Sequence, residues 1–196
     1  MSCGKAMFGR CPRHERLADA VAILARDAGY APRRNAPVQC LGEARDGSLH
    51  LYRPADILMA GDNHQSVCVD VTVVSPLNLS TVFKPAGKYP GRAAAEAARG
   101  KIEKHEINCT AAAKDFVPFA ADVCGYLDQD AVELLHRFAH RIGVRSGRGF
   151  KDAWRSCRRR ISIAIQAGVA LQLVPLFGLW RDEQWDVGAS YLCGGG

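Results

Sequence analysis

The sequence of 196 residues predicts an α/β fold, in which helices flank one sheet. Residues 67–74 read VCVDVTVV, a β-branched run that is typical of a strand buried on both faces. Residues 92–114 are rich in alanine and in charges of both signs, a pattern that predicts a helix. Residues 115–123 (DFVPFAADV) predict another strand. This order favours a helical crossover between two strands of one sheet.

Earlier in the chain, the sequence predicts two strands joined by a hairpin turn. Residues 38–41 and 49–59 are the strand candidates, and Asp46-Gly47 marks the turn between them. Pro54 interrupts the second strand, which indicates an edge position or a bulge. Three further segments are expected to be helices: residues 12–29, 128–143 and 150–174.

Composition and charge narrow the classes of function. Hydrophobic residues make up 48% of the chain and charged residues 23%, a balance that excludes a wholly disordered protein. Lys and Arg number 26 against 20 Asp and Glu, so the formal net charge is +6. This excess of positive charge favours an anionic partner, either nucleic acid or an acidic membrane surface.

The eight cysteines are expected to be free thiols in a reducing, intracellular compartment. The N-terminal segment holds basic side chains but lacks the apolar run of a secretory signal. Cys68 and Cys109 sit in patterns that are typical of small buried residues. Cys3, Cys11 and His14 are an alternative set of zinc ligands, but a structural zinc site uses four ligands and no second close pair accompanies them.

Residues 161–180 raise the question of a membrane span, because they carry no charge and follow three consecutive arginines. Three polar side chains within this stretch would be costly toward lipid, and Pro175 interrupts it near its end. We therefore expect a buried C-terminal helix that ends before Pro175, and no membrane partner.

Two carboxylates are candidates for chemistry. Asp56 lies in RPADIL at the end of a predicted strand, and Asp70 lies among valines in VCVDVTVV. An aspartate buried there without a partner would cost several kcal/mol, so it needs a cation, a hydrogen-bond network or an open cleft. Thirteen residues separate the two acids, which is enough for two antiparallel strands and a turn. Both side chains can therefore reach one point in space.

The next predicted helix adds positive charge. Lys101 and His105 share a helix face, and Lys104 neighbours Lys101. Two acids and a lysine that converge on one cleft fit metal-assisted phosphodiester hydrolysis. The acids would hold Mg²⁺, which activates water and neutralises phosphate charge, and the lysine would stabilise the transition state. The alternative is structural: a hydrogen-bonded strand aspartate, a turn-capping aspartate and a solvated helix face.

The order of these motifs resembles the restriction-enzyme-like endonuclease domain of non-LTR retrotransposons, within the PD-(D/E)xK nuclease superfamily. The resemblance runs through roughly residues 3–174 and implies a restriction-endonuclease-like α-β-β-β-α-β-α core at 12–174. Residues 1–11 resemble the end of a zinc knuckle or linker, and residues 175–196 are expected to be an unstructured tail. The segments that carry the resemblance are RCPRHERLADAV, RPADIL, VDVTVVSPL, AAAEAARGKIEKHEINC, DFVPFAADVCGYL and RRISIAIQAGVALQL.

Carried over residue by residue, the resemblance implies that Asp56 and Asp70 bind Mg²⁺ or Mn²⁺. It makes Lys101 the catalytic lysine, with Lys104 as its rival and His105 beside them in the catalytic set. The implied reaction is a nick in duplex target DNA that leaves a 3′-OH for reverse transcription. The element's RNA would be a partner through upstream domains, and the product of a eukaryotic element would act in the nucleus.

The sequence departs from the family pattern at three positions. Thr72 stands where the superfamily usually has its lysine, and the retrotransposon branch also lacks that lysine. His105 stands where tyrosine is commoner, and Asn35 stands about where a glutamate is expected. These departures leave a second reading open, namely a catalytically inactive nuclease fold that binds DNA.

Nucleic-acid contacts are expected at two places. The resemblance puts Arg13 and His14 near the cleft or the DNA. Residues 145–160 hold seven Arg and Lys against one acid, so a helix there would carry a basic stripe suited to phosphate contacts, with Trp154 facing elsewhere. The alternative is a solvated helix face. The stripe consists of Lys151, Arg155, Arg158 and Arg159.

Overall fold

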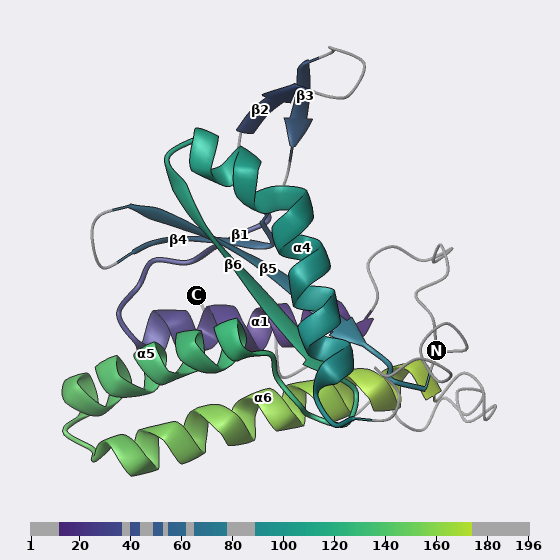
Figure 1. Cartoon of the computed structure of the whole chain (residues 1–196). Helices are drawn as coiled ribbons and strands as arrows, with labels where there is room; N and C mark the ends of the chain where they lie inside the picture. Colours follow the sequence, from purple (N-terminus) through teal and green to yellow (C-terminus); the bar gives the residue numbers. More distant parts are fainter. Residues whose placement is uncertain are drawn as a thin grey trace, which may run out of the picture.

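The computed structural model describes residues 12–36, 40–43, 49–52, 55–61, 65–77 and 89–173. Within these ranges, helices flank both faces of a four-stranded open mixed sheet, which confirms the α/β class (Figure 1). The helices are α1 (Pro12–Asp27), α4 (Arg92–Ala111), α5 (Gln129–Ser146) and α6 (Phe150–Leu173). The strands are β1 (Arg33–Arg34), β2 (Cys40–Glu43), β3 (Leu49–Tyr52), β4 (Ile57–Ala60), β5 (Ser66–Val74) and β6 (Lys114–Asp122).

The main sheet has the strand order β1-β4-β5-β6. Strands β1, β4 and β5 are antiparallel neighbours, with Ile57 of β4 opposite Val69 of β5. Strand β6 runs parallel to β5, with Phe119 opposite Val71. Helix α4 connects these two parallel strands, so the predicted helical crossover between the strands at 67–74 and 115–123 is confirmed.

Alternation along β5 divides the interior into two sides. Val67, Val69 and Val71 belong to the main core, which they share with residues of α1, α5 and α6. Cys68 packs on the other side with Cys109 of α4, and both thiols are fully buried, as predicted. Helix α4 therefore covers one face of the sheet, and α1, α5 and α6 lie on the other (Figure 1).

The predicted strand at 49–59 is wrong, because the chain forms two short strands there. Strand β3 pairs with β2 in a separate two-stranded sheet, and β4 joins the main sheet. The main-sheet pairing begins at Asp56, whose N–H donates to the Val69 carbonyl. Strand β2 also extends to Glu43, inside the segment expected to be a turn, and β1 was not predicted. The isolated Arg33–Arg34 pair lacks any alternation of apolar and polar residues.

The C-terminal helix follows the prediction closely, since α6 ends at Leu173, before Pro175. No helix in the described part of the chain is long and apolar enough to cross a membrane. Residues 174–180 of the candidate span lie outside the described residues, as do Cys3 and Cys11 of the alternative zinc set and the tail at 175–196.

Candidate functional site

Asp56 and Asp70 lie side by side at the main sheet. Asp56 comes just before β4 and Asp70 is in the middle of β5, so the antiparallel pairing of these strands brings the acids together. The Asp56 Oδ2 accepts a hydrogen bond of 2.9 Å from the N–H of Val71, the residue after Asp70. Both aspartates are nearly buried, with exposed fractions of 7% and 6%. The structure therefore brings the two carboxylates together.

Lys101 of α4 contacts this pair of acids. Its Nζ lies 2.8 Å from Oδ2 of Asp70. Burial raises the pKa of Asp70, the ammonium of Lys101 opposes that rise, and the charge of Asp56 adds to it. Lys104 is exposed on the same helix, and within the described residues it forms no ion pair with Asp56 or Asp70. Of the two lysines that the sequence left as rivals, Lys101 is the one that contacts Asp70.

His105 is a buried residue of α4. Its Nε2 lies 3.8 Å from Oδ2 of Asp70, and its ring packs against Phe116 with centroids 5.8 Å apart. Burial, with the nearby charges of Lys104 and then Lys101, lowers the pKa of His105 to about 4. The imidazole is therefore neutral at pH 7, and its approach to Asp70 is not an ion pair.

His14 contributes a second basic side chain from the first turn of α1. Its Nε2 lies 2.8 Å from Oδ2 of Asp56, and its Nδ1 lies 3.3 Å from Oε1 of Glu15. Burial alone would lower the pKa of His14, but the bond to Asp56 and the charges of Asp56 and Glu15 raise it further than burial lowers it. Glu15 is held in turn by Arg34, at 2.6 Å. A polar chain thus runs from Asp56 through His14 and Glu15 to β1.

Sequence reasoning placed His14 near the cleft only through the family resemblance, and it missed Glu15 and Arg34. The signal for Glu15 is its position beside His14, since both start the same helix. Arg34 has no comparable signal, because β1 itself was not predicted. Asn35 follows it with a positive φ of 52°, and its N–H donates to the carbonyl of Asp56 at 2.9 Å. Asn35 supports Asp56 through its backbone.

The two carboxylates fit a hard divalent cation. Mg²⁺ usually keeps several waters and is held by one or two carboxylates together with phosphate oxygens of the substrate. Asp56 and Asp70 supply that number of carboxylates. Within the described ranges, no group of three or more His, Cys, Asp or Glu side chains could hold a metal ion by itself. Asp56 and Asp70 are thus the described residues that could hold such an ion.

Arg13 lies inside the protein rather than at its surface. The residue is 2% exposed, and a Cβ placed on Gly168 of α6 would come within 2.7 Å of the Arg13 Cα. This close approach shows that Arg13 is where α1 packs against α6. A direct contact between this side chain and DNA would require the guanidinium to leave its buried position.

The basic stripe lies on the outer side of α6, where it lines a hollow of about 420 Å³. Trp154 lines the same hollow, so the prediction that this ring faces elsewhere is wrong. Trp154 and Arg158 are four residues apart on the helix and are therefore surface neighbours. The Arg158 guanidinium carbon lies 5.9 Å from the centroid of the Trp154 ring. The lining residues are Lys151, Trp154, Arg155, Arg158, Arg159 and Ser162.

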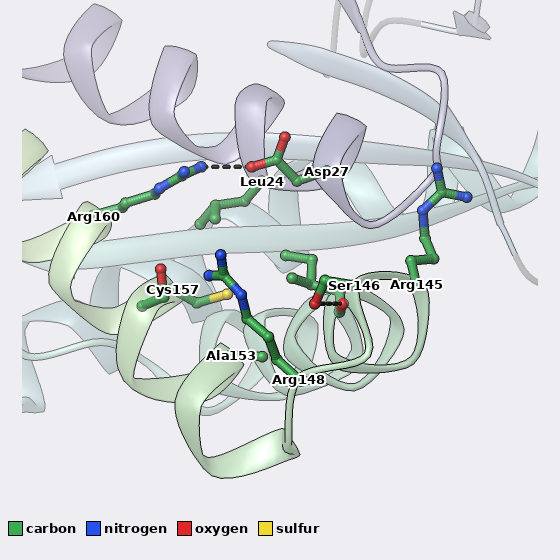
Figure 2. A pocket seen from close by; sticks show the side chains of 10 residues that line it. Leu24, Asp27, Arg145, Ser146, Arg148, Ala153, Cys157 and Arg160 are labelled. Atoms are coloured by element: carbon green, nitrogen blue, oxygen red, sulfur yellow. Dashed lines mark hydrogen bonds and ion pairs between the residues drawn. The ribbon is translucent and has the colours of Figure 1, made fainter.

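A second hollow, of about 360 Å³, lies where α1, α5 and α6 meet (Figure 2). Three arginines line it, but its positive charge is partly compensated. Arg160 pairs with Asp27, and the Arg145 guanidinium lies against Gly29, just after the C-terminal end of α1. Arg148 reaches into this hollow from the loop between α5 and α6 (Figure 2).

The acids and the basic stripe belong to different elements. Asp70 contacts Lys101 of α4, and Asp56 contacts His14 at the start of α1, whereas the stripe consists of residues of α6. Comparison with known proteins adds no relative, since no protein-family model and no curated protein matches this chain.

Proposed function

We propose that this chain is a metal-dependent DNA endonuclease domain of the retrotransposon type, which nicks target DNA by phosphodiester hydrolysis. One observation carries the proposal. Asp56 and Asp70 meet on adjacent strands, with the Nζ of Lys101 2.8 Å from the second acid. The order of elements in the main sheet also supports a restriction-endonuclease-like core: a helix, three antiparallel strands, a crossover helix and a parallel strand.

The roles of the side chains follow from their positions. Asp56 and Asp70 would hold Mg²⁺, and the ion would activate water and neutralise phosphate charge. The oxygen of water would form a bond to phosphorus as the water gives up a proton to solvent. The bond from phosphorus to the 3′ oxygen would break, and that oxygen would take up a proton, which leaves a 3′-OH and a 5′-phosphate. Lys101, whose Nζ lies beside Asp70, would stabilise the negative charge that develops on the phosphate.

A second candidate function is a nuclease fold that binds DNA without cutting it. The observation that favours it is that both acids already have basic partners, since the Nζ of Lys101 lies 2.8 Å from Asp70 and the Nε2 of His14 lies 2.8 Å from Asp56. In this alternative these partners hold the buried carboxylates permanently, and the basic side chains of α6 alone contact DNA.

Nicking of supercoiled plasmid tests the proposal. The purified chain is compared in Mg²⁺ and in EDTA with two variants, Asp70→Asn and Asp115→Asn. Asp115 is a matched control because it is an exposed aspartate on the neighbouring strand β6. We expect Mg²⁺-dependent nicking by the wild type and by Asp115→Asn, and none by Asp70→Asn, with circular dichroism showing that all three are folded.

Two outcomes would argue against the nuclease. Equal nicking by Asp70→Asn would show that the cleavage comes from elsewhere and that the site is misassigned. A folded wild-type chain that binds plasmid but leaves it intact in Mg²⁺ and in Mn²⁺ would select the non-cutting alternative.

A further inference from the structure

The hollow on the outer side of α6 concentrates positive charge that the described residues leave largely uncompensated. Arg155 pairs with Asp152, and both side chains are mostly exposed. Neighbouring cations recur along the stripe at spacings of three and four residues, as at Lys151, Arg155 and Arg158. Like charges at this spacing destabilise a helix. An anionic ligand would remove that repulsion.

Trp154 packs in an aromatic cluster beside these cations. Its ring is nearly parallel to that of Phe150, at 11° with centroids 6.4 Å apart, and His136 of α5 packs against both rings. The ring is only half-buried, and it lines the hollow. The aromatic cluster thus supports Trp154 from within the protein and leaves part of the ring available to a ligand.

Cations and an aromatic ring together favour a particular class of ligand. Phosphates of duplex DNA would use the cations, but a duplex keeps the faces of its bases inside the stack. Unpaired nucleotides offer phosphates and exposed base faces at once, and grooves for single strands combine basic side chains with aromatic stacking. We propose that this hollow binds unpaired nucleotides of a nucleic-acid strand, with a base stacked on Trp154.

The hollow and the acids are built from different elements, because residues of α6 line the hollow whereas the acids contact α4 and the start of α1. A ligand in the hollow can therefore be separate from the duplex at the acids. The inference deepens the nucleic-acid contact of the proposed function, and it rests on that function only for the class of partner. It does not depend on cleavage, so its test can be made without metal.

The test measures binding of the full chain to fluorescently labelled oligo(dT), oligo(rU) and duplex DNA in EDTA, by anisotropy. We expect tighter binding to the single strands than to the duplex, and a loss of about tenfold or more in Trp154→Ala. Trp154→Phe should retain most of the affinity. Arg158→Ala should weaken binding to the single strands. Arg148→Ala removes the same charge from the other hollow and should leave that binding unchanged. A comparison of the affinities for oligo(dT) and oligo(rU) shows whether the hollow prefers DNA or RNA.

A second measurement reports on the ring itself. The chain has three tryptophans, so replacement of Trp180 and Trp185 by phenylalanine leaves Trp154 as the only indole. Oligo(dT) should then quench its fluorescence. Unchanged affinity in Trp154→Ala, a preference for duplex or the absence of quenching would overturn the inference.

The Asp70→Asn variant separates this inference from the proposed function. Oligo(dT) binding by Asp70→Asn would support the α6 site whatever the nicking result. Binding by a wild-type chain that does not nick plasmid would count against the nuclease alone. Nicking by a wild-type chain that does not bind oligo(dT) would count against the α6 site alone.

Discussion

The Nε2 of His14 lies 2.8 Å from Oδ2 of Asp56, and this contact ties the first turn of α1 to the start of β4. The same carboxylate oxygen accepts the N–H of Val71. Asp56 is thus fixed from two directions by groups 42 and 15 residues away in the chain. Such contacts hold a carboxylate in one orientation before any ligand arrives, and they make its environment sensitive to the protonation of the histidine.

The raised pKa of His14 makes folding stability depend on pH. A histidine whose folded pKa lies above its unfolded value stabilises the protein fully below the unfolded pKa, near 6.5, and that contribution is lost as the pH rises through the folded pKa. We therefore expect the free energy of unfolding in urea to fall above about pH 6.5 in the wild type and to stay flatter in His14→Gln. His140→Gln, at an exposed position of α5, should follow the wild type. Parallel profiles for His14→Gln and the wild type would contradict the contact.

Lys101 should matter for stability as well as for nicking. In Lys101→Met, Asp70 stays buried without its ion pair, so its pKa should rise further and the free energy of unfolding at pH 7 should fall by about 1–2 kcal/mol. The lysine is 32% exposed, which keeps this loss below that of a fully buried pair. Nicking should fall by about 100-fold or more.

Lys104→Met is the matched control, because Lys104 is exposed on the same helix. Its unfolding free energy should stay within about 0.5 kcal/mol of the wild type. Urea titrations of both variants and a carbon-13 titration of Asp70 make the comparison. If Lys104→Met loses more nicking activity than Lys101→Met, the roles of the two lysines are reversed.

Local patterns predicted the elements whose own residues determine them. The β-branched run at 67–74 became β5, and the alanine-rich segment at 92–114 became α4, each with ends shifted by three residues or fewer. The strand expected at 49–59 failed for a nonlocal reason. Its two halves pair with different partners, β2 and β5, and periodicity within one segment does not show which strand will pair with it.

Part of the candidate site could be predicted from the sequence in the same way, and part could not. The spacing of Asp56 and Asp70 places them on neighbouring antiparallel strands, so their meeting could be predicted from the chain. The support that Arg34 gives to Glu15 could not, because it depends on where α1 crosses the sheet. The prediction that Trp154 faces away from the basic stripe was wrong, although the helical spacing contains the answer. Trp154 comes three residues after Lys151 and four before Arg158, so it lies on the same helix face as both.

The contact between α1 and α6 should tolerate no side chain at Gly168. A Cβ there would come within 2.7 Å of the Arg13 Cα, a backbone atom that cannot move aside alone. Gly168→Ala should therefore lower the free energy of unfolding by about 1–3 kcal/mol, although alanine favours a helix. Gly100→Ala in α4 is the control, because its Cβ would meet nothing within 4 Å, and it should raise stability by up to about 1 kcal/mol. Thermal and urea unfolding of both variants measure the difference. An equal gain in both would mean that the helices are not in close contact at Gly168.

Asp128 caps α5 and offers a test of a buried carboxylate outside the candidate site. Its Oδ2 accepts the N–H of Asp130 at 3.0 Å, and its Oδ1 accepts that of Ala120 at 2.9 Å. Burial raises the pKa of Asp128 to about 6, although both hydrogen bonds act in the opposite direction. Because this folded pKa lies above the unfolded value of 3.8, the protonated group stabilises the fold below pH 3.8, and that contribution fades as the pH rises through 6.

The free energy lost in Asp128→Ala should consequently shrink as the pH rises from about 4 to about 6.5. A loss remains at pH 7 because the cap and the bond to Ala120 are both removed, and this loss should be about 1–2 kcal/mol. Urea unfolding across this pH range measures the trend, with Asp115→Ala, at an exposed position of β6, as the control that should show no comparable change. A loss that grows with pH would show that the hydrogen bonds outweigh burial and that the folded pKa of Asp128 lies below its unfolded value.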